Sequence, residues 1–165
     1  MVWIGYMQIV TVHAQLRAYV YVSRAEIINV TIEGNGVPEA KIFIKNYGPT
    51  PARKMINISN MIGPHIDPPT LNLSIPDKSF ASHRTRMDLP PSDSFSSTTR
   101  GPRPLTQEEK RGLANKQLAF YVYGEIRYRD IFGRKQWTKY RLMTGGPVGV
   151  SGSVLFGCEE GNEAT

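Results

Sequence analysis

The feature that most constrains the fold is a long segment, residues 118–143, in which apolar and polar side chains alternate on either side of one turn. Apolar residues with this period indicate strands that bury one face. They are Leu118, Phe120, Val122, Ile126 and Tyr128 in the first half, and alternation resumes over 136–142. Asp130 to Gly133 supplies the turn, because Asp bonds to its own backbone and Gly accepts a positive φ. We therefore predict a β-hairpin that carries no catalytic group.

Other segments rich in β-branched and aromatic residues indicate more strands. They lie at residues 18–32, 38–45, 52–61, 70–75, 84–89 and 154–156. Strands spaced by roughly ten residues with turn residues between them are typical of a β-sandwich. Pro49 and Pro51 prevent a helix between two of these strands. We predict a mainly β, antiparallel sandwich over residues 17–158, followed by a C-terminal tail at 159–165.

One helix is indicated, at about residues 106–114. Thr106 and Glu109 form a capping box, in which each side chain bonds to the backbone N–H of the other residue. The preceding segment 92–104 is polar and interrupted by Pro and Gly, so we predict a loop there, and the most mobile internal segment. The helix is then a short connector between this loop and the hairpin.

Composition sets broad limits on the chain. Its 165 residues suit one ordinary domain. The net charge of +6 and the pI of about 9.5 favour anionic partners, although the same excess is common on a merely solubilising surface. Cys158 is the only cysteine, so neither an intrachain disulfide nor a cysteine-based metal site can form.

Residues 1–12 are apolar over too short a run to span a bilayer, which needs about 20 residues. The segment also lacks the basic start and cleavage site of a secretory signal. Two interpretations remain: a buried first element of the domain, or the end of a membrane helix whose earlier part lies outside this chain. Trp3 and Tyr6 suit the interfacial belt of such a helix.

The residues that usually carry catalysis or metal binding are scattered. His13, His65 and His83 have no ligand spacing. The aspartates lie beside prolines, serines or turns, which suits caps better than acid–base chemistry. No nucleophile-elbow, phosphate-loop, dinucleotide or zinc-protease motif occurs in the sequence. We expect a non-enzymatic protein with no cofactor, no metal and no small-molecule substrate.

The hairpin does carry a basic and aromatic constellation. Strand alternation places Tyr121, Tyr123, Glu125 and Arg127 on one face, and Lys135, Trp137, Lys139 and Arg141 on one face of the return strand. If the register joins these sets, they form a surface of the kind that binds nucleic acids or anionic lipid head groups. The alternative is that Trp137 points inward as a core tryptophan and the cations are only solvated. The candidate binding residues are Tyr121, Tyr123, Arg127, Lys135, Trp137, Lys139 and Arg141.

Several short segments together resemble one protein group. They are residues 17–20, 46–52, 105–106, 123–133, 137–138 and 161–164. The chain resembles, over nearly its whole length, uncharacterised bacterial proteins that are common in soil proteobacteria. These have one or two N-terminal membrane helices followed by an immunoglobulin-like β-sandwich. The resemblance implies that residues 1–16 are an apolar, helical tail at the bacterial inner membrane. It implies no biochemical activity, and it leaves a protein or the membrane surface as the expected partner.

The cysteine pattern of this group is only half present. Many members carry one cysteine just after the aromatic of the last long strand and another near the C-terminus. Here Arg141 follows Tyr140, and Cys158 holds the second place. The disulfide that the resemblance implies therefore cannot form. Arg17 and Arg24 favour a cytoplasmic domain, whereas the family cysteines favour the other side of the membrane, so the side stays open.

Overall fold

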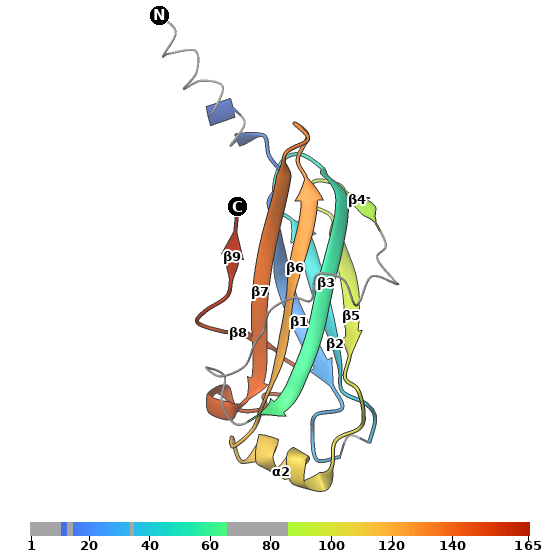
Figure 1. Ribbon diagram of the computed structural model, residues 1–165, viewed down its shortest axis with the longest axis vertical. Helices are drawn as coiled ribbons and strands as arrows, with labels where there is room; N and C mark the ends of the chain where they lie inside the picture. Colours follow the sequence, from blue (N-terminus) through green and yellow to red (C-terminus); the bar gives the residue numbers. More distant parts are fainter. Residues whose placement is uncertain (1–10, 13–14, 34, 66–85) are drawn as a thin grey trace, which may run out of the picture.

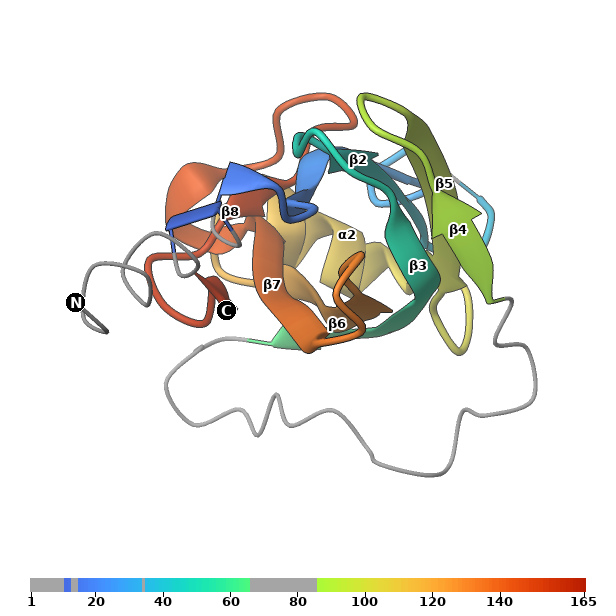
Figure 2. The same cartoon turned by 90° about the horizontal axis from the view of Figure 1, so that it is seen from above.

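The chain forms two antiparallel β-sheets packed face to face, with one helix closing one end (Figures 1 and 2). The computed structural model describes residues 11–12, 15–33, 35–65 and 86–165. Sheet I is three-stranded, in the order β1-β2-β5. Sheet II is six-stranded, in the order β4-β3-β6-β7-β8, and β9 also pairs with β7. The prediction of a mainly β sandwich is confirmed.

The bounds of the elements follow the chain. They are β1 (Val20–Ile28), β2 (Glu39–Asn46), β3 (Ala52–His65), β4 (Met87–Leu89), β5 (Ser94–Arg100), α2 (Gln107–Ala114), β6 (Ala119–Arg129), β7 (Lys135–Gly145), the 3-10 helix η2 (Gly146–Val148), β8 (Phe156–Gly157) and β9 (Glu163–Ala164). The core lies between the two sheets and takes apolar side chains from both.

The predicted hairpin is β6 and β7, which pair over their full length. The turn between them is fixed by Asp130, whose Oδ1 accepts the backbone N–H groups of Phe132 and Arg134, each at 2.9 Å. Gly133 has a φ of 80°, which only glycine adopts without strain. The alternation prediction is confirmed too, since the predicted apolar residues of β6 face the core.

Gly124 interrupts the apolar pattern of β6 for a packing reason. A Cβ at this position would lie 2.5 Å from the Ile58 carbonyl oxygen and would overlap the hydroxyl of Tyr140. The missing side chain makes room for the Tyr140 ring, which is buried. Its hydroxyl donates a hydrogen bond to Asn57 Oδ1 at 3.0 Å. Burial raises the pKa of Tyr140, and hydrogen bonds with Asn57 and Ser59 oppose that shift only in part.

A buried asparagine organises the end of the sandwich where the chain enters β1. Asn46 Oδ1 accepts the N–H groups of Tyr19 and Gly48, at 3.2 and 3.0 Å. Its Nδ2 donates to the carbonyls of Thr50 and Leu89, at 2.8 and 3.2 Å. One side chain thus joins the entry to β1, the β2–β3 turn and the end of β4. Each bond satisfies a polar group that would be costly to bury alone.

The predicted loop at 92–104 is wrong over 94–100, which form the edge strand β5. β5 pairs with β2 residue by residue, from Lys45 opposite Ser94 to Glu39 opposite Arg100. Its side chains alternate, and Phe95 packs against the core. Polarity misled the prediction, because an edge strand with one solvated face tolerates Ser and Thr. Within the predicted tail 159–165, residues 163–164 likewise form β9.

The predicted helix is confirmed as α2. Its capping box is complete, and the side chain of Arg103 lies 2.7 Å from Glu109. That contact is the main reason why the pKa of Glu109 falls to about 2. Strand 84–89 is confirmed in its described part by β4, whereas the strand predicted at 70–75 and most of the predicted tail 1–16 lie outside the described residues. Within the described ranges, no helix has the length and apolar character needed to cross a membrane.

Candidate functional site

The register of the hairpin brings the predicted residues together on the outer face of sheet II. Tyr123 faces Arg141, Glu125 faces Lys139, and Arg127 faces Trp137. Trp137 is half-buried on this outer face, whereas Gln136 and Thr138 on either side of it are buried. The alternative of an inward core tryptophan is therefore wrong.

The predicted exposure of Tyr121 and Tyr123 is also wrong, because their side chains are only 1% and 5% exposed. They form a second apolar cluster with Ala119 and Met143, and Ile62 and Cys158 pack against it. The hydroxyl of Tyr123 accepts a hydrogen bond from Asn60 Nδ2 at 3.0 Å. Alternation identifies which face a side chain takes, but it does not say whether that face is solvated. This half of the outer face therefore offers no stacking surface.

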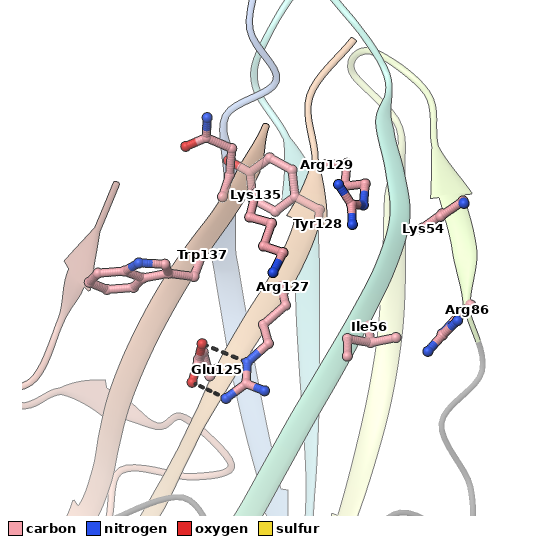
Figure 3. A pocket seen from close by; sticks show the side chains of 10 residues that line it. Lys54, Ile56, Arg86, Glu125, Arg127, Tyr128, Arg129, Lys135 and Trp137 are labelled. Carbon is pink, nitrogen blue, oxygen red and sulfur yellow. Dashed lines mark hydrogen bonds and ion pairs between the residues drawn. The ribbon is translucent and has the colours of Figure 1, made fainter. Parts of the chain in front are cut away.

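The other half of the face contains a basic hollow of about 530 Å³ (Figure 3). Its lining comes from β3, β6, β7 and the chain before β4. The residues are Lys54, Ile56, Arg86, Glu125, Arg127, Tyr128, Arg129, Lys135, Gln136 and Trp137. Five cationic side chains thus surround one carboxylate, and the Trp137 ring forms one edge. We call this site the basic hollow.

The cations of the basic hollow differ in how far they are neutralised. Arg127 donates through Nε and Nη2 to both oxygens of Glu125, at 2.7 and 3.0 Å. Arg129 donates through Nη1 to the carbonyl of Gly133 at 2.8 Å, which orients it without removing its charge. Figure 3 shows Lys54 and Arg86 on one side of the hollow and Lys135 on the other. Among the described residues, the side chains of Lys54, Arg86 and Lys135 make no hydrogen bond or ion pair.

A row of like charges crosses three strands at the hollow's outer end. Arg53 on β3 faces Arg129 on β6, and Arg129 faces Lys135 on β7. All three side chains are exposed. Like charges placed directly opposite one another in a sheet destabilise it, by roughly 0.2–1 kcal/mol a pair. An anion bound between them would offset this repulsion. We call these three residues the cation row.

The remaining predicted residues face the C-terminal tail instead. Lys139 Nζ lies 3.5 Å from Glu163 Oε2 and 4.8 Å from the centroid of the Trp137 ring. Arg141 packs along Gly161, where a Cβ would overlap its side chain. Of the seven predicted residues, the basic hollow therefore contains Arg127, Lys135 and Trp137. Its other cations were missed, although Arg129 continues the alternation of Arg127 and could have been found.

The chemistry available at the site is electrostatic. No three His, Cys, Asp or Glu side chains of the described ranges lie close enough together to hold a metal ion. Burial raises the pKa of the Cys158 thiol, and the nearby Arg141 opposes the shift. A raised pKa lowers the thiolate fraction, which is the nucleophilic form. Comparison with known proteins finds no match to a family model, to a curated protein or to a solved structure.

Proposed function

We propose that the protein is a non-enzymatic binding domain whose basic hollow binds ligands that carry several phosphate groups. The observation that carries the proposal is the cation row, since Arg53, Arg129 and Lys135 face one another with no carboxylate between them. Phosphate oxygens accept strong, charge-assisted hydrogen bonds from Arg and Lys. A multivalent anion could reach the cation row and the cations of the hollow at once.

The wider setting that we propose is a membrane-associated bacterial protein with an immunoglobulin-like sandwich, as the sequence resemblance implies. One contact supports this part of the proposal. The Cys158 N–H donates to the Arg141 carbonyl at 3.0 Å. The two positions that carry cysteines in the resembling proteins therefore lie side by side in this chain. A disulfide at those positions would be compatible with this sandwich.

Nucleic acid is the alternative ligand that the chain's composition favours, and Trp137 supports it because a half-buried ring at the edge of a basic groove can stack on a base. Two observations weaken this alternative. Lys139 Nζ already lies over that ring, and Tyr121 and Tyr123 are buried. Tyr128 is buried as well, so Trp137 is the one ring of the basic hollow on which a base could stack. We therefore propose that the site recognises phosphate groups rather than bases.

The experiment that tests the proposal is calorimetric titration of the protein with inositol hexakisphosphate, a soluble ligand with several phosphates. The test variant is Arg129→Gln with Lys135→Gln. The control variant, Lys41→Gln with Arg100→Gln, removes the same charge from the exposed outer face of sheet I. We expect the Kd to rise about tenfold in the test variant, for a loss of roughly 1.4 kcal/mol, and to change little in the control.

Equal weakening of both variants would mean that net charge, not the basic hollow, attracts the ligand. If neither the wild type nor the control variant binds inositol hexakisphosphate, the proposal is wrong. Raising the salt concentration should weaken wild-type binding, because exposed cations are screened.

A further inference from the structure

The two ends of the sandwich carry different charge. The tip end contains the entry to β1, the β2–β3 turn, the β4–β5 connection and the β6–β7 turn, and it is the upper end in Figure 1. Residues 16–21, 45–54, 86–94 and 129–136 form it, with eight Lys or Arg side chains and three carboxylates. The opposite end is formed by residues 28–33, 101–118 and 145–152. It has four Lys or Arg side chains and three carboxylates. The excess of positive charge in these segments therefore lies mostly at the tip end.

The three carboxylates of the tip end serve as backbone acceptors. Asp88 accepts the N–H of Lys54 and Asp93 accepts the N–H of Ser94, both at 2.8 Å. Asp130 holds the β6–β7 turn and is itself buried. These contacts shape the loops from which the cations project. The end consequently presents a positive surface to a partner that approaches along the long axis of the sandwich.

Large apolar side chains project from the same loops. Tyr47 in the β2–β3 turn is 57% exposed and Phe132 in the β6–β7 turn is 39% exposed. Lys45 Nζ lies 5.3 Å from the centroid of the Tyr47 ring. Arg134 and Lys135 follow Phe132 in the sequence after a single glycine. Aromatic rings beside Lys and Arg are the composition found where proteins meet the head-group region of a bilayer.

The chain also enters the sandwich at this end. The hydroxyl of Thr50 donates to the Leu16 carbonyl at 2.7 Å, so the entry segment is fastened to the β2–β3 turn. Leu16 is exposed, and so is Val12, the last residue of the apolar run 1–12. Exposed apolar side chains from three separate segments therefore gather at the positively charged end.

We propose that the tip end docks on an anionic membrane surface, with Phe132 and Tyr47 entering the head-group region. This inference rests on the proposed function and names the source of its phosphates as lipid head groups. The cation row would then lie at the level of the phosphates, while the two rings occupy the interface beneath them. The occupant is a lipid surface, because a soluble anion would leave the exposed rings at the loop tips in water, whereas a bilayer interface would bury them.

The test is co-sedimentation of the full chain with vesicles of phosphatidylcholine, with or without about a third phosphatidylserine. The tip variant is Phe132→Ser with Tyr47→Ser. The matched control is Ile32→Ser with Val148→Ser, which removes two exposed apolar side chains from the opposite end; Ile32 is 53% exposed. We expect wild type and control to sediment with the anionic vesicles, and the partition coefficient of the tip variant to fall about tenfold.

Titration with inositol hexakisphosphate separates this inference from the proposed function. The tip variant should keep wild-type affinity for the soluble ligand, because neither ring lines the basic hollow. If wild type binds the soluble ligand but not the anionic vesicles, or if the tip variant sediments like wild type, the docking inference is wrong and the proposed function stands. If wild type binds neither, both are wrong. Thermal unfolding of each variant checks that the fold is intact.

Discussion

The two outer faces of the sandwich use the same residue types in different arrangements. On sheet I, the Arg24 guanidinium lies 4.0 Å from the centroid of the Phe43 ring and 3.7 Å from Glu26, and Lys41 lies 5.1 Å from that ring. On sheet II, Tyr121 and Tyr123 are buried in a cluster of their own, and three cations face one another. Composition alone therefore does not identify a binding surface; the cross-strand neighbours of each charge do.

Register explains the difference between the faces. On sheet I it places Glu26 opposite Lys41 and Glu39 opposite Arg100, so opposite charges meet across the strands. On sheet II it places Arg53, Arg129 and Lys135 in one row. A face that neutralises its own charges gains little from an anion, whereas a face that accumulates like charge gains more. The variants below test this contrast, from the largest expected effect to the smallest.

The deepest contrast is in how the rings are buried. Replacing Tyr121 of sheet II with Ala should lower the free energy of unfolding by about 3–4 kcal/mol, because the side chain fills the second apolar cluster. The matched change Phe43→Ala on sheet I should cost about 1 kcal/mol, since that ring is only half-buried. Urea denaturation followed by circular dichroism measures both. Similar losses for the two rings would mean that the outer faces are equally packed.

A second variant concerns the edge of sheet II, where Cys158 lies beside Arg141. Arg141→Cys should form a disulfide under oxidising conditions and raise the free energy of unfolding by about 3 kcal/mol, as expected for the loop that it closes. Thermal unfolding with and without dithiothreitol measures the gain. The reduced variant is the internal control. A mass spectrum that shows two thiols after oxidation would mean that the side chains diverge.

The third variant tests the turn that sets the hairpin register. Asp130→Ala removes the acceptor of the Phe132 and Arg134 N–H groups and of Gln136 Nε2, and should cost about 2 kcal/mol. Asp93→Ala is the control before β5 of sheet I. Among the described residues its exposed carboxylate accepts one hydrogen bond, from the N–H of Ser94, so the change should cost under about 1 kcal/mol. Chemical denaturation gives both values. A larger loss at Asp93 would reverse this part of the comparison.

The hairpin, the capped helix and the sandwich class were predictable because each rests on local chemistry. Alternation over 118–128 and 136–142 indicated the strands that form β6 and β7, and the capping box indicated the start of α2. β5 escaped prediction because its pairing with β2 is a long-range interaction. Its polar residues are compatible with a loop and with an edge strand, and only the partner strand decides between them.

The candidate site was half predictable for the same reason. The residues of one hairpin could be assigned to one face, because two adjacent strands share a register through their turn. Lys54 and Arg86 come from β3 and from the chain before β4, and nothing local connects them with the hairpin. The burial of Tyr121 and Tyr123 depends on a cluster that draws on β3, β6, β7 and Cys158. These are tertiary contacts between segments distant in the sequence, and the alternation within one hairpin cannot predict them.

The smallest expected effect is also the most direct test of the contrast, because its sign should differ between the faces. Lys135→Gln should raise the free energy of unfolding by about 0.5 kcal/mol at low salt, since it removes one cation from a row of three. Arg24→Gln on sheet I should lower it by a similar amount, because that cation interacts with Phe43 and Glu26.

Both effects should shrink as salt rises, because exposed charges are screened within about 10 Å at 0.1 M. Parallel denaturation series at low and high ionic strength measure the two slopes. If both substitutions lower the free energy of unfolding, the cation row is already neutralised in the folded protein. The main support for an anion at the basic hollow would then be lost. Opposite signs that converge with salt would show that the row stores repulsion, which is the free energy that a bound phosphate would recover.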